Sequence, residues 1–317
     1  MVNTRPPIPE PQFTTIRNFK ASFSELPKDS MCLDFLDEYL WKGDHIFVHP
    51  ETRVVSTDLK HSPRDILDYW SNIVFTSNSS EDYSAFLPYA RGRLYYVART
   101  IIDYFEKSGS TNLSFCDFAT GQGVLPNLLR REMPNWTIRC TEGSKLLCER
   151  IRNDGFNVDA CMLGNGEIPP FEVKVASLTW TLCNCIRPLD VLLEVRNHIS
   201  DGGYLVIAES SRLLVPFRKS LRDLIFNGHP ADVHPYYFSI NTLNALMKCA
   251  GFSSVYINRY YDSDVMLVIG RKDKSLPDEN EVVFGDSSIL VRSFFETYHG
   301  LTPMFDDMKH SASSTIK

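Results

Sequence analysis

Two acids and two glycines in the middle of the chain have the types and the spacing to bind a nucleoside. Asp117 ends an apolar run and precedes Gly121 and Gly123, and Glu142 lies about twenty residues beyond the second glycine. Glycines let the backbone pass close beneath a ligand, because they carry no Cβ and allow a positive φ. A helix that begins beside such a turn offers unpaired N–H groups to an anionic ligand group. An acid at the next strand tip can accept hydrogen bonds from two ribose hydroxyls, so the stretch predicts a nucleoside-cofactor site.

The loop does not follow the two best-known phosphate-binding patterns. A dinucleotide fingerprint needs a third glycine where this chain has Pro126, and that glycine permits close packing of the helix on the strand. Proline is tolerated in a first helical turn, but it does not serve this purpose. The loop also lacks the lysine of G-x-x-x-x-G-K-[ST]. The loop therefore differs from both patterns, although the residues still suit a nucleoside cofactor.

The segment Asp117-Phe118-Ala119-Thr120-Gly121-Gln122-Gly123 resembles the D-x-[AG]-x-G-x-G signature of class I S-adenosylmethionine-dependent methyltransferases. The resemblance implies S-adenosyl-L-methionine as the cofactor, with the glycine loop beside its methionine part and Glu142, followed by Gly143, at the ribose. Ligands of open α/β sheets lie outside the carboxyl ends of the strands, and two further segments follow apolar runs that read as strands. We therefore expect adenine near Met162 and Leu163, in the range 162–165, and the methionine end near Trp180, Thr181 and Leu182.

The rest of the chain supports this resemblance in the expected order. An apolar run at 174–180 suits a buried parallel strand. Further on, the pattern predicts a helix at 188–198, a strand at 204–209, a helix at 240–250 closed by Gly251, and strands at 254–260 and 264–270. The resemblance then implies an α/β fold with a doubly wound, mostly parallel seven-stranded sheet whose last strand is antiparallel.

The chain divides into three expected parts. Residues 1–110 form an N-terminal cap with helices and a hairpin, residues 111–272 the cofactor domain, and residues 273–317 a C-terminal extension. The hairpin is expected at 45–49 and 53–56. Aromatic side chains are dense in the N-terminal part, where they either line a substrate pocket or form a small core. The polar end of the chain is expected to be disordered from about His310.

Methyl transfer from a sulfonium asks little of the protein beyond holding the acceptor in line with the methyl group. A hydroxyl or acidic C–H acceptor also needs a base that titrates near neutrality. The candidates are His234, His229 and Glu209. His234 is preferred, because imidazole has an unperturbed pKa near 6.5 and the residue lies on a connection that begins at a strand's carboxyl end. Each candidate also has a structural interpretation: a turn histidine beside proline, or an acid paired with an arginine such as Arg212.

The segment from His229 to Ser239 is similar to an H-P-x-x-F-S stretch of bacterial methyltransferases that act on sugars and related small metabolites. The acceptor implied is a small molecule, with a nucleotide-linked sugar as one example. Relatives that methylate carbon carry an N-terminal zinc module rich in cysteine, whereas here only Cys32 precedes residue 116. The transfer is therefore open to oxygen or nitrogen as well as carbon.

Composition excludes several other classes of protein. A formal charge of −6 argues against a nucleic-acid partner, which needs a basic face. The first twelve residues lack the apolar core of a secretory signal, and no run of about twenty apolar residues predicts a membrane span. Cysteines within apolar segments suit reduced thiols, and Cys183 and Cys185 alone cannot form a zinc site, so no metal is expected. A cytoplasmic enzyme fits these features.

Two alternatives remain open at this point. A nicotinamide-dependent, NAD(P)-linked oxidoreductase uses a similar sheet, although Pro126 and the lack of a second glycine-rich strand turn count against it. A scaffold protein that keeps the fold without catalysis is the second. The intact Asp117, Gly121, Gly123 and Glu142 argue against this second interpretation.

Overall fold

The computed structural model describes residues 12–23, 29–40, 43–58, 60–69, 82–107, 109, 111–209, 213–215, 221, 225, 234–261, 263 and 265–315, without the side chains of residues 12, 82–91, 306 and 308–315. The strands are β1 Gln12–Thr15, β2 Met31–Cys32, β3 Ile46–Val48, β4 Val55–Thr57, β5 Ser114–Phe118, β6 Thr137–Glu142, β7 Asn157–Ala160, β8 Val173–Thr179, β9 Ile199–Glu209, β10 Tyr236–Tyr237, β11 Phe252–Ile257, β12 Met266–Lys272 and β13 Val282–Gly285. The helices are α1 Ile16–Ala21, α2 Pro63–Asp68, α3 Asp82–Lys107, α4 Val124–Glu132, α5 Lys145–Asn153, α6 Pro188–Asn197, α8 Ile240–Cys249 and α9 Ser288–Thr315, with 3-10 turns η1 Asp34–Tyr39 and η3 Leu182–Asn184.

A seven-stranded sheet forms the centre of the molecule, with the strand order β11-β12-β9-β8-β5-β6-β7. The pairs from β9 to β7 are parallel, whereas β12 runs antiparallel to both β9 and β11. The chain order reverses between β5 and β8, which is where open α/β sheets bind their ligands. The predicted fold class, a doubly wound sheet with an antiparallel last strand, is confirmed.

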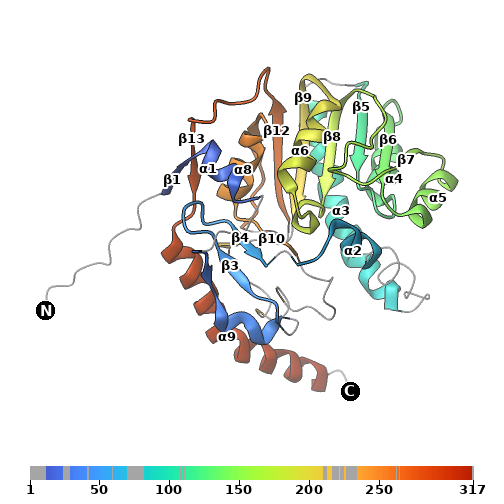
Figure 1. Ribbon diagram of the computed structural model, residues 1–317. Coiled ribbons are helices and arrows are strands. Elements are labelled where there is room, and N and C mark those ends of the chain that lie inside the picture. Colours follow the sequence, from blue (N-terminus) through green and yellow to red (C-terminus); the bar gives the residue numbers. More distant parts are fainter. Residues whose placement is uncertain are drawn as a thin grey trace, which may run out of the picture.

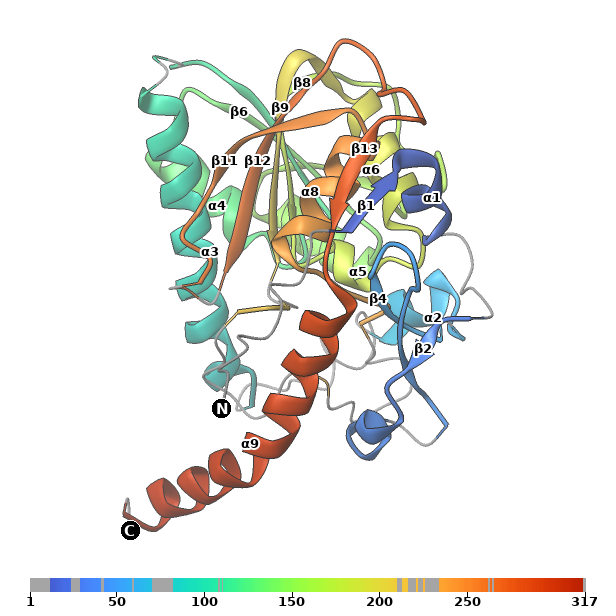
Figure 2. The same cartoon turned by 90° about the vertical axis from the view of Figure 1, so that its left-hand side faces the viewer.

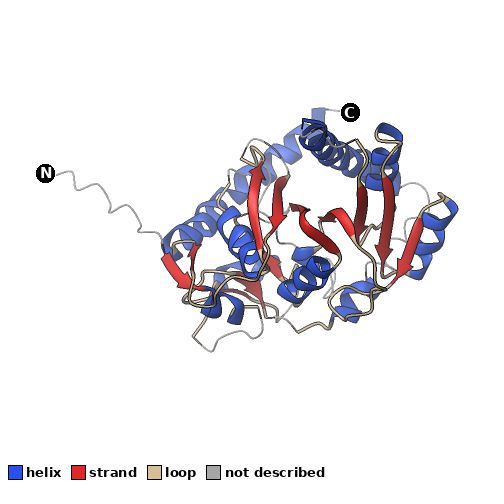
Figure 3. Ribbon diagram, turned by 90° about the horizontal axis from the view of Figure 1, so that it is seen from above, coloured by secondary structure: helices blue, strands red, loops and turns tan. Residues whose placement is uncertain are grey.

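Helices cover both faces of this sheet (Figures 1 and 3). Successive residues of β9 enter opposite cores because strand side chains alternate in direction: Leu205 and Ile207 face one core and Val206 the other. The Val206 side packs against α3 and α4, and the opposite side packs against α1, α6 and α8 (Figure 2). Both faces of the sheet are therefore buried, which explains why the parallel strands consist of nearly continuous apolar residues.

A second, smaller lobe joins the two ends of the described chain. Its sheet has the order β10-β4-β3-β2, and its core combines this sheet and η1 with residues of α9 such as Val291 and Phe295. The strands β1 and β13 also pair, with Gln12 opposite Gly285. The C-terminal helix α9 thus packs on the N-terminal lobe, as Figure 1 shows in red and blue.

Several local predictions agree with the structure. The expected hairpin forms as β3 and β4, with Val48 opposite Val55. Gly251 ends α8 with a φ of 73°, as expected for a C-cap glycine. At the C-terminus, where disorder was expected from about His310, α9 extends as far as Thr315. Within the described residues, no helix has the length and apolar character needed to cross a bilayer.

Candidate active site

The glycine loop joins the carboxyl end of β5 to α4 through a run of left-handed residues. Gly121 has a φ of 62° and Gly123 a φ of 75°, while Ala119 adopts 52° although it carries a side chain. A Cβ on Gly121 would meet no atom within 4 Å, so the backbone there borders open space. Trp180, which follows the adjacent strand β8, has a φ of 53°. Left-handed residues other than glycine are strained and cluster at functional sites. Ala119 and Trp180 are such residues, and they follow the neighbouring strands β5 and β8.

Glu142, at the end of β6, ties this loop to the next strand. Its Oε2 accepts the N–H of Gly121 and its Oε1 accepts the N–H of Ser144, each at 2.8 Å. The carboxyl is buried, and burial raises its pKa in spite of these bonds. The backbone N–H of Gly143 also contributes, and since a carboxylate offers about four lone-pair sites, capacity for a further donor remains. The arrangement therefore suits a ligand with two adjacent hydroxyls, as in a ribose.

Asp117 lies beneath the loop rather than at its surface. The carboxyl is 1% exposed, and its Oδ1 accepts the hydroxyl of Ser177 at 2.5 Å. Burial raises its pKa to about 7, and its Oδ2 has no hydrogen-bond partner. The hydroxyl of Thr120 donates to the Asp117 carbonyl at 2.7 Å. Asp117 thus supports the loop from the sheet side, and Thr120 closes the turn above it.

The segment after β8 is held by an acid of the neighbouring strand. Glu209, at the end of β9, is fully buried, and its Oε1 accepts the N–H of Leu182 at 2.9 Å. Burial raises its pKa to about 7. The N–H of Trp180 donates to the Ala208 carbonyl at 2.7 Å. The chain from Trp180 to Leu182 is therefore fixed on β9 through both backbone and carboxylate contacts.

His234 is positioned by an amide of the same segment. Its Nδ1 lies 2.9 Å from Oδ1 of Asn184, whose Nδ2 donates to the Trp180 carbonyl at 3.0 Å. Because that amide oxygen only accepts, Nδ1 carries the proton and the lone pair is left on Nε2. Burial lowers the pKa of His234 to about 4, so the expectation of an unperturbed value near 6.5 is wrong, and the imidazole is a weaker base that is neutral near pH 7. A neutral imidazole with its second nitrogen unprotonated can accept a proton.

The N-terminal lobe covers this edge of the sheet. A side chain on Gly143 would meet Cδ1 of Leu67, in α2, at 3.0 Å. Tyr236, in β10, donates its hydroxyl to the Ile186 carbonyl at 3.3 Å. Leu67 of α2 and Tyr236 of β10 therefore lie over the strand ends of β6 and β8. Met162 and Leu163 follow β7 at the same edge, where the N–H of Cys161 donates to the Glu142 carbonyl at 3.1 Å.

A hollow of about 860 Å³ lies beside this site and is distinct from it. It is lined chiefly by helix residues such as Tyr95 of α3, Asn127 and Arg131 of α4 and Arg150 of α5. Gln122 is the residue of the glycine loop that reaches it. A hollow between helices lacks the acids and strand ends described above, so it does not explain their arrangement.

The structure joins most of the predicted site residues at one edge. Hydrogen bonds connect the glycine loop with Glu142, and others connect the segment from Trp180 to Leu182 with Glu209 and His234. His229 and Arg212 lie outside the described residues. Sequence reasoning did not find Asn184 or Ser177, which act on His234 and Asp117 from distant segments. The polar Asn184 in an otherwise apolar stretch is the signal that could have identified it.

Comparisons with known proteins agree with this geometry. Residues 89–257, more than half of the chain, match a family model described as a methyltransferase domain. The structure of PigF with SAH is 20% identical with a TM-score of 0.42, over 50% of this chain and 56% of that one. A putative O-methyltransferase from Nostoc punctiforme PCC 73102 is 12% identical with a TM-score of 0.46, over 60% and 58%. The chain thus spans little more than half the length of these two proteins. No curated protein matches the sequence.

One further structure establishes the similarity of fold. Magnesium protoporphyrin IX methyltransferase from Synechocystis PCC 6803, with bound SAH, is 10% identical and has a TM-score of 0.51, over 67% of this chain and 100% of that chain. The strand order and the family match define the class of protein: the chain belongs to the methyltransferase-domain family. This family agrees with the resemblance to class I S-adenosylmethionine-dependent methyltransferases that the segment from Asp117 to Gly123 carries. This result favours methyl transfer over the nicotinamide-dependent alternative.

Proposed function

We propose that this enzyme transfers the methyl group of S-adenosylmethionine to a small-molecule acceptor, with His234 as general base. The observation that carries the proposal is the pair formed by His234 Nδ1 and Asn184 Oδ1, at 2.9 Å. It leaves a neutral imidazole with a free lone pair at the carboxyl edge of the sheet. An acceptor hydroxyl or amine must lose a proton as it gains the methyl group, and the histidine provides a destination for that proton.

The residues fit the cofactor on two grounds. Open space borders Gly121, and Glu142 keeps capacity for a ribose hydroxyl beside its bonds to backbone N–H groups. We assign the ribose to Glu142 and Gly143, the adenine to Met162 and Leu163, and the methionine end to the segment from Trp180 to Leu182. The glycine loop, from Ala119 through Thr120 to Gly123, borders the methionine part. When bound, the cofactor supplies an activated sulfonium methyl.

Glu209 has a positioning role in this proposal. Burial raises its pKa to about 7, so by basicity alone Glu209 is better matched to neutral pH than His234, whose pKa is about 4. Its carboxyl is, however, fully buried and its Oε1 accepts the N–H of Leu182, so we assign it a positioning role and keep His234 as the base. By fixing the segment that follows β8, Glu209 determines where Trp180 and Asn184 lie. Asn184 in turn fixes the tautomer and the orientation of the imidazole. Misplacement of a reacting group by about 1 Å can cost about 10²-fold in rate, so such support is part of the catalytic geometry.

The acceptor class is the least constrained part of the proposal. The similarity of the segment around His234 to sugar-modifying methyltransferases keeps nucleotide-linked sugars among the acceptors. The low pKa of His234, about 4, points in a second direction, because a weak base is better matched to an acidic hydroxyl than to an aliphatic one. Phenols and enols are therefore included beside sugars, and carboxylates, which need no base because they are ionised at neutral pH, serve as a comparison.

The test is an acceptor screen with S-adenosylmethionine and the full chain, in which mass spectrometry detects the methylated product. The panel holds nucleotide sugars, free sugars, phenols and small carboxylic acids, together with a protein and an RNA sample. We expect methylation within the small-molecule set and its loss in His234→Ala. Methylation of protein or RNA alone would overturn the acceptor class, and unchanged turnover in His234→Ala would overturn the base.

A further inference from the structure

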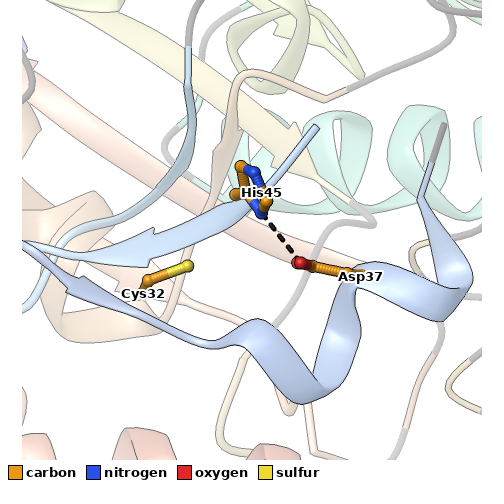
Figure 4. Close-up of side chains that lie close together, drawn as sticks. All are labelled: Cys32, Asp37 and His45. Atoms are coloured by element: carbon orange, nitrogen blue, oxygen red, sulfur yellow. Dashed lines mark hydrogen bonds and ion pairs between the residues drawn. The ribbon is translucent and has the colours of Figure 1, made fainter. Parts of the chain in front are cut away.

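Three side chains of metal-ligating type converge in the N-terminal lobe, away from the active site. Cys32 ends β2, Asp37 lies in η1, and His45 precedes β3. One potential ligand atom of each lies within 4.8 Å of the other two, and Figure 4 shows the three side chains turned toward one another. Nδ1 of His45 lies 2.9 Å from Oδ2 of Asp37. The cluster thus brings a thiol, a carboxylate and an imidazole to one point.

Backbone pairing between β2 and β3 holds these residues close together. The strands β2 and β3 pair with Cys32 opposite Phe47, and the N–H of Leu33 donates to the Ile46 carbonyl at 2.9 Å. The chain leaves this strand pair at residue 33 and returns to it at residue 45, and η1 lies between these two points. Two ligands therefore lie on a paired sheet edge, and the third reaches them from a short helical turn.

Two features of the cluster indicate a capacity for a ligand. Asp37 Oδ1 is a buried atom that has no hydrogen-bond partner among the described residues, so one carboxylate oxygen can take a ligand. Access is also open: the side chains of His45 and Asp37 are 40% and 37% exposed. Of the eight cysteines, all within the described residues, Cys32 is the exposed one. An ion from solvent can therefore reach all three groups.

The electrostatic surroundings favour a cation. Asp34, Asp37 and Asp58 all lie close enough to Cys32 to act on it electrostatically, so acidic side chains surround the cluster. Glu38 also lies on η1, where it faces His299 at 3.5 Å. Lys60, a positive charge of the same lobe within the described residues, is paired with Asp58 and lies 3.4 Å from Asp44.

We propose that Cys32, Asp37 and His45 form a Zn²⁺ site with water as the fourth ligand. Thiolate, imidazole and carboxylate are the ligands that Zn²⁺ takes at about 2.0–2.3 Å, in sites with three protein ligands and one open position. A thiolate disfavours Ca²⁺ and Mg²⁺, which prefer oxygen ligands. Binding requires a tightening of the cluster and release of the thiol proton, so the affinity increases with pH.

The site has a consequence for the lobe as a whole. Zinc joins η1 to the β2–β3 pair, and the same sheet extends through β4 to β10, which begins two residues after His234. The ion stabilises the lobe that covers the strand ends, because a ligand bound by the folded state alone adds to its stability. The proposal does not depend on the acceptor or on the catalytic base.

The test uses the full chain, freed of metal with a chelator and titrated with CoCl₂ or ZnCl₂ alone. Cobalt should give the thiolate-to-metal charge-transfer absorption of a sulfur ligand, zinc should abolish it by displacement, and zinc should slow the reaction of Cys32 with a thiol reagent. Cys32→Ser should remove the absorption, and Asp37→Asn should weaken zinc binding by more than about 100-fold, beyond the cost of losing an outer-shell partner.

Glu38→Gln provides the matched control, since it neutralises the next acid of η1 without removing a ligand. It should leave zinc affinity close to that of the parent protein. The three-ligand site is overturned if the parent shows no charge-transfer absorption, if the absorption persists in Cys32→Ser, or if Glu38→Gln weakens binding as much as Asp37→Asn. Circular dichroism of each variant verifies that it is folded before titration.

Discussion

The cofactor side and the acceptor side of the active site lie at the same edge of the sheet but are built differently. On the cofactor side, Glu142 binds the backbone of Gly121 and Ser144, all within one strand-loop-helix-strand unit. On the acceptor side, the contact joins the side chains of Asn184 and His234, 50 residues apart in sequence. The first is a property of a local unit, whereas the second depends on how the lobe packs on the sheet.

The two sides also differ in charge. Glu142 retains backbone donors for both of its oxygens, which partly offset the cost of burial. His234 has an amide oxygen as its partner, and burial alone lowers its pKa. The cofactor side is thus arranged to hold a negative charge near a ligand, while the acceptor side keeps its base neutral. Substitutions on the first side should affect binding, and substitutions on the second should affect turnover.

The largest effect is expected from His234→Ala. Loss of a general base typically lowers the rate by about 10²–10⁴-fold, whereas cofactor affinity should stay near that of the parent protein. Single-turnover kinetics with the true acceptor, together with calorimetry for the cofactor, measure both quantities. Equal losses of turnover and cofactor affinity would show that the two sides are not separable.

Glu142→Ala should give the next largest effect, on binding. Removal of a charge-assisted contact to the ribose should weaken cofactor affinity by about 1.5–3 kcal/mol. Asp159→Asn is the matched control, because Asp159 lies on the neighbouring strand β7 and pairs with Arg139 at 2.7 Å. Calorimetry should separate the two variants; equal affinities would remove the ribose assignment.

Asn184→Leu should lower turnover by about tenfold, which corresponds to the loss of one hydrogen bond of ~1.5 kcal/mol. A purely structural role would not alter the pH profile, so Asn184→Asp is the sharper variant. The parent protein should lose activity as pH falls toward about 4, where His234 becomes protonated. In Asn184→Asp, a carboxylate partner favours the protonated imidazole, so the loss of activity at low pH should begin at a higher pH. Asn244→Leu, on α8, should leave the profile unchanged.

The last prediction concerns stability instead of binding or turnover. Asp117 has a pKa of about 7 instead of 3.8, so its proton is held more tightly in the folded state. Its contribution to stability is full below about pH 4 and is lost as pH rises toward about 7, at no more than about 1.4 kcal/mol per pH unit. Glu209 acts in the same direction, and His234, with a lowered pKa, in the opposite one.

Urea unfolding across this pH range measures the contribution of Asp117 as a difference. In the parent protein, the ionisation of Asp117 should lower the free energy of unfolding as pH rises. Asp117→Asn should not show this decrease, whereas Asp159→Asn should retain it. Identical pH dependences for the parent and Asp117→Asn would show that the Asp117 carboxyl is ionised in the folded state across the range.

The sequence by itself determined the sheet, the glycine loop and the acid at the end of β6. These features depend on contacts within short units: alternating burial along strands, positive φ at Gly121 and Gly123, and one strand-loop-helix-strand repeat. A buried parallel strand and a tight turn impose the same residue types wherever they occur, so local patterns are sufficient to find them.

Tertiary structure alone decided which distant side chains meet. Asn184 reaches His234, Ser177 reaches Asp117, and α9 completes the core of the N-terminal lobe. Cys32, Asp37 and His45 also converge, although their spacing matches no zinc motif. Such contacts form only after loops have closed and the lobe has docked on the sheet. Because side-chain identity constrains these long-range encounters weakly, no local pattern in the sequence records them.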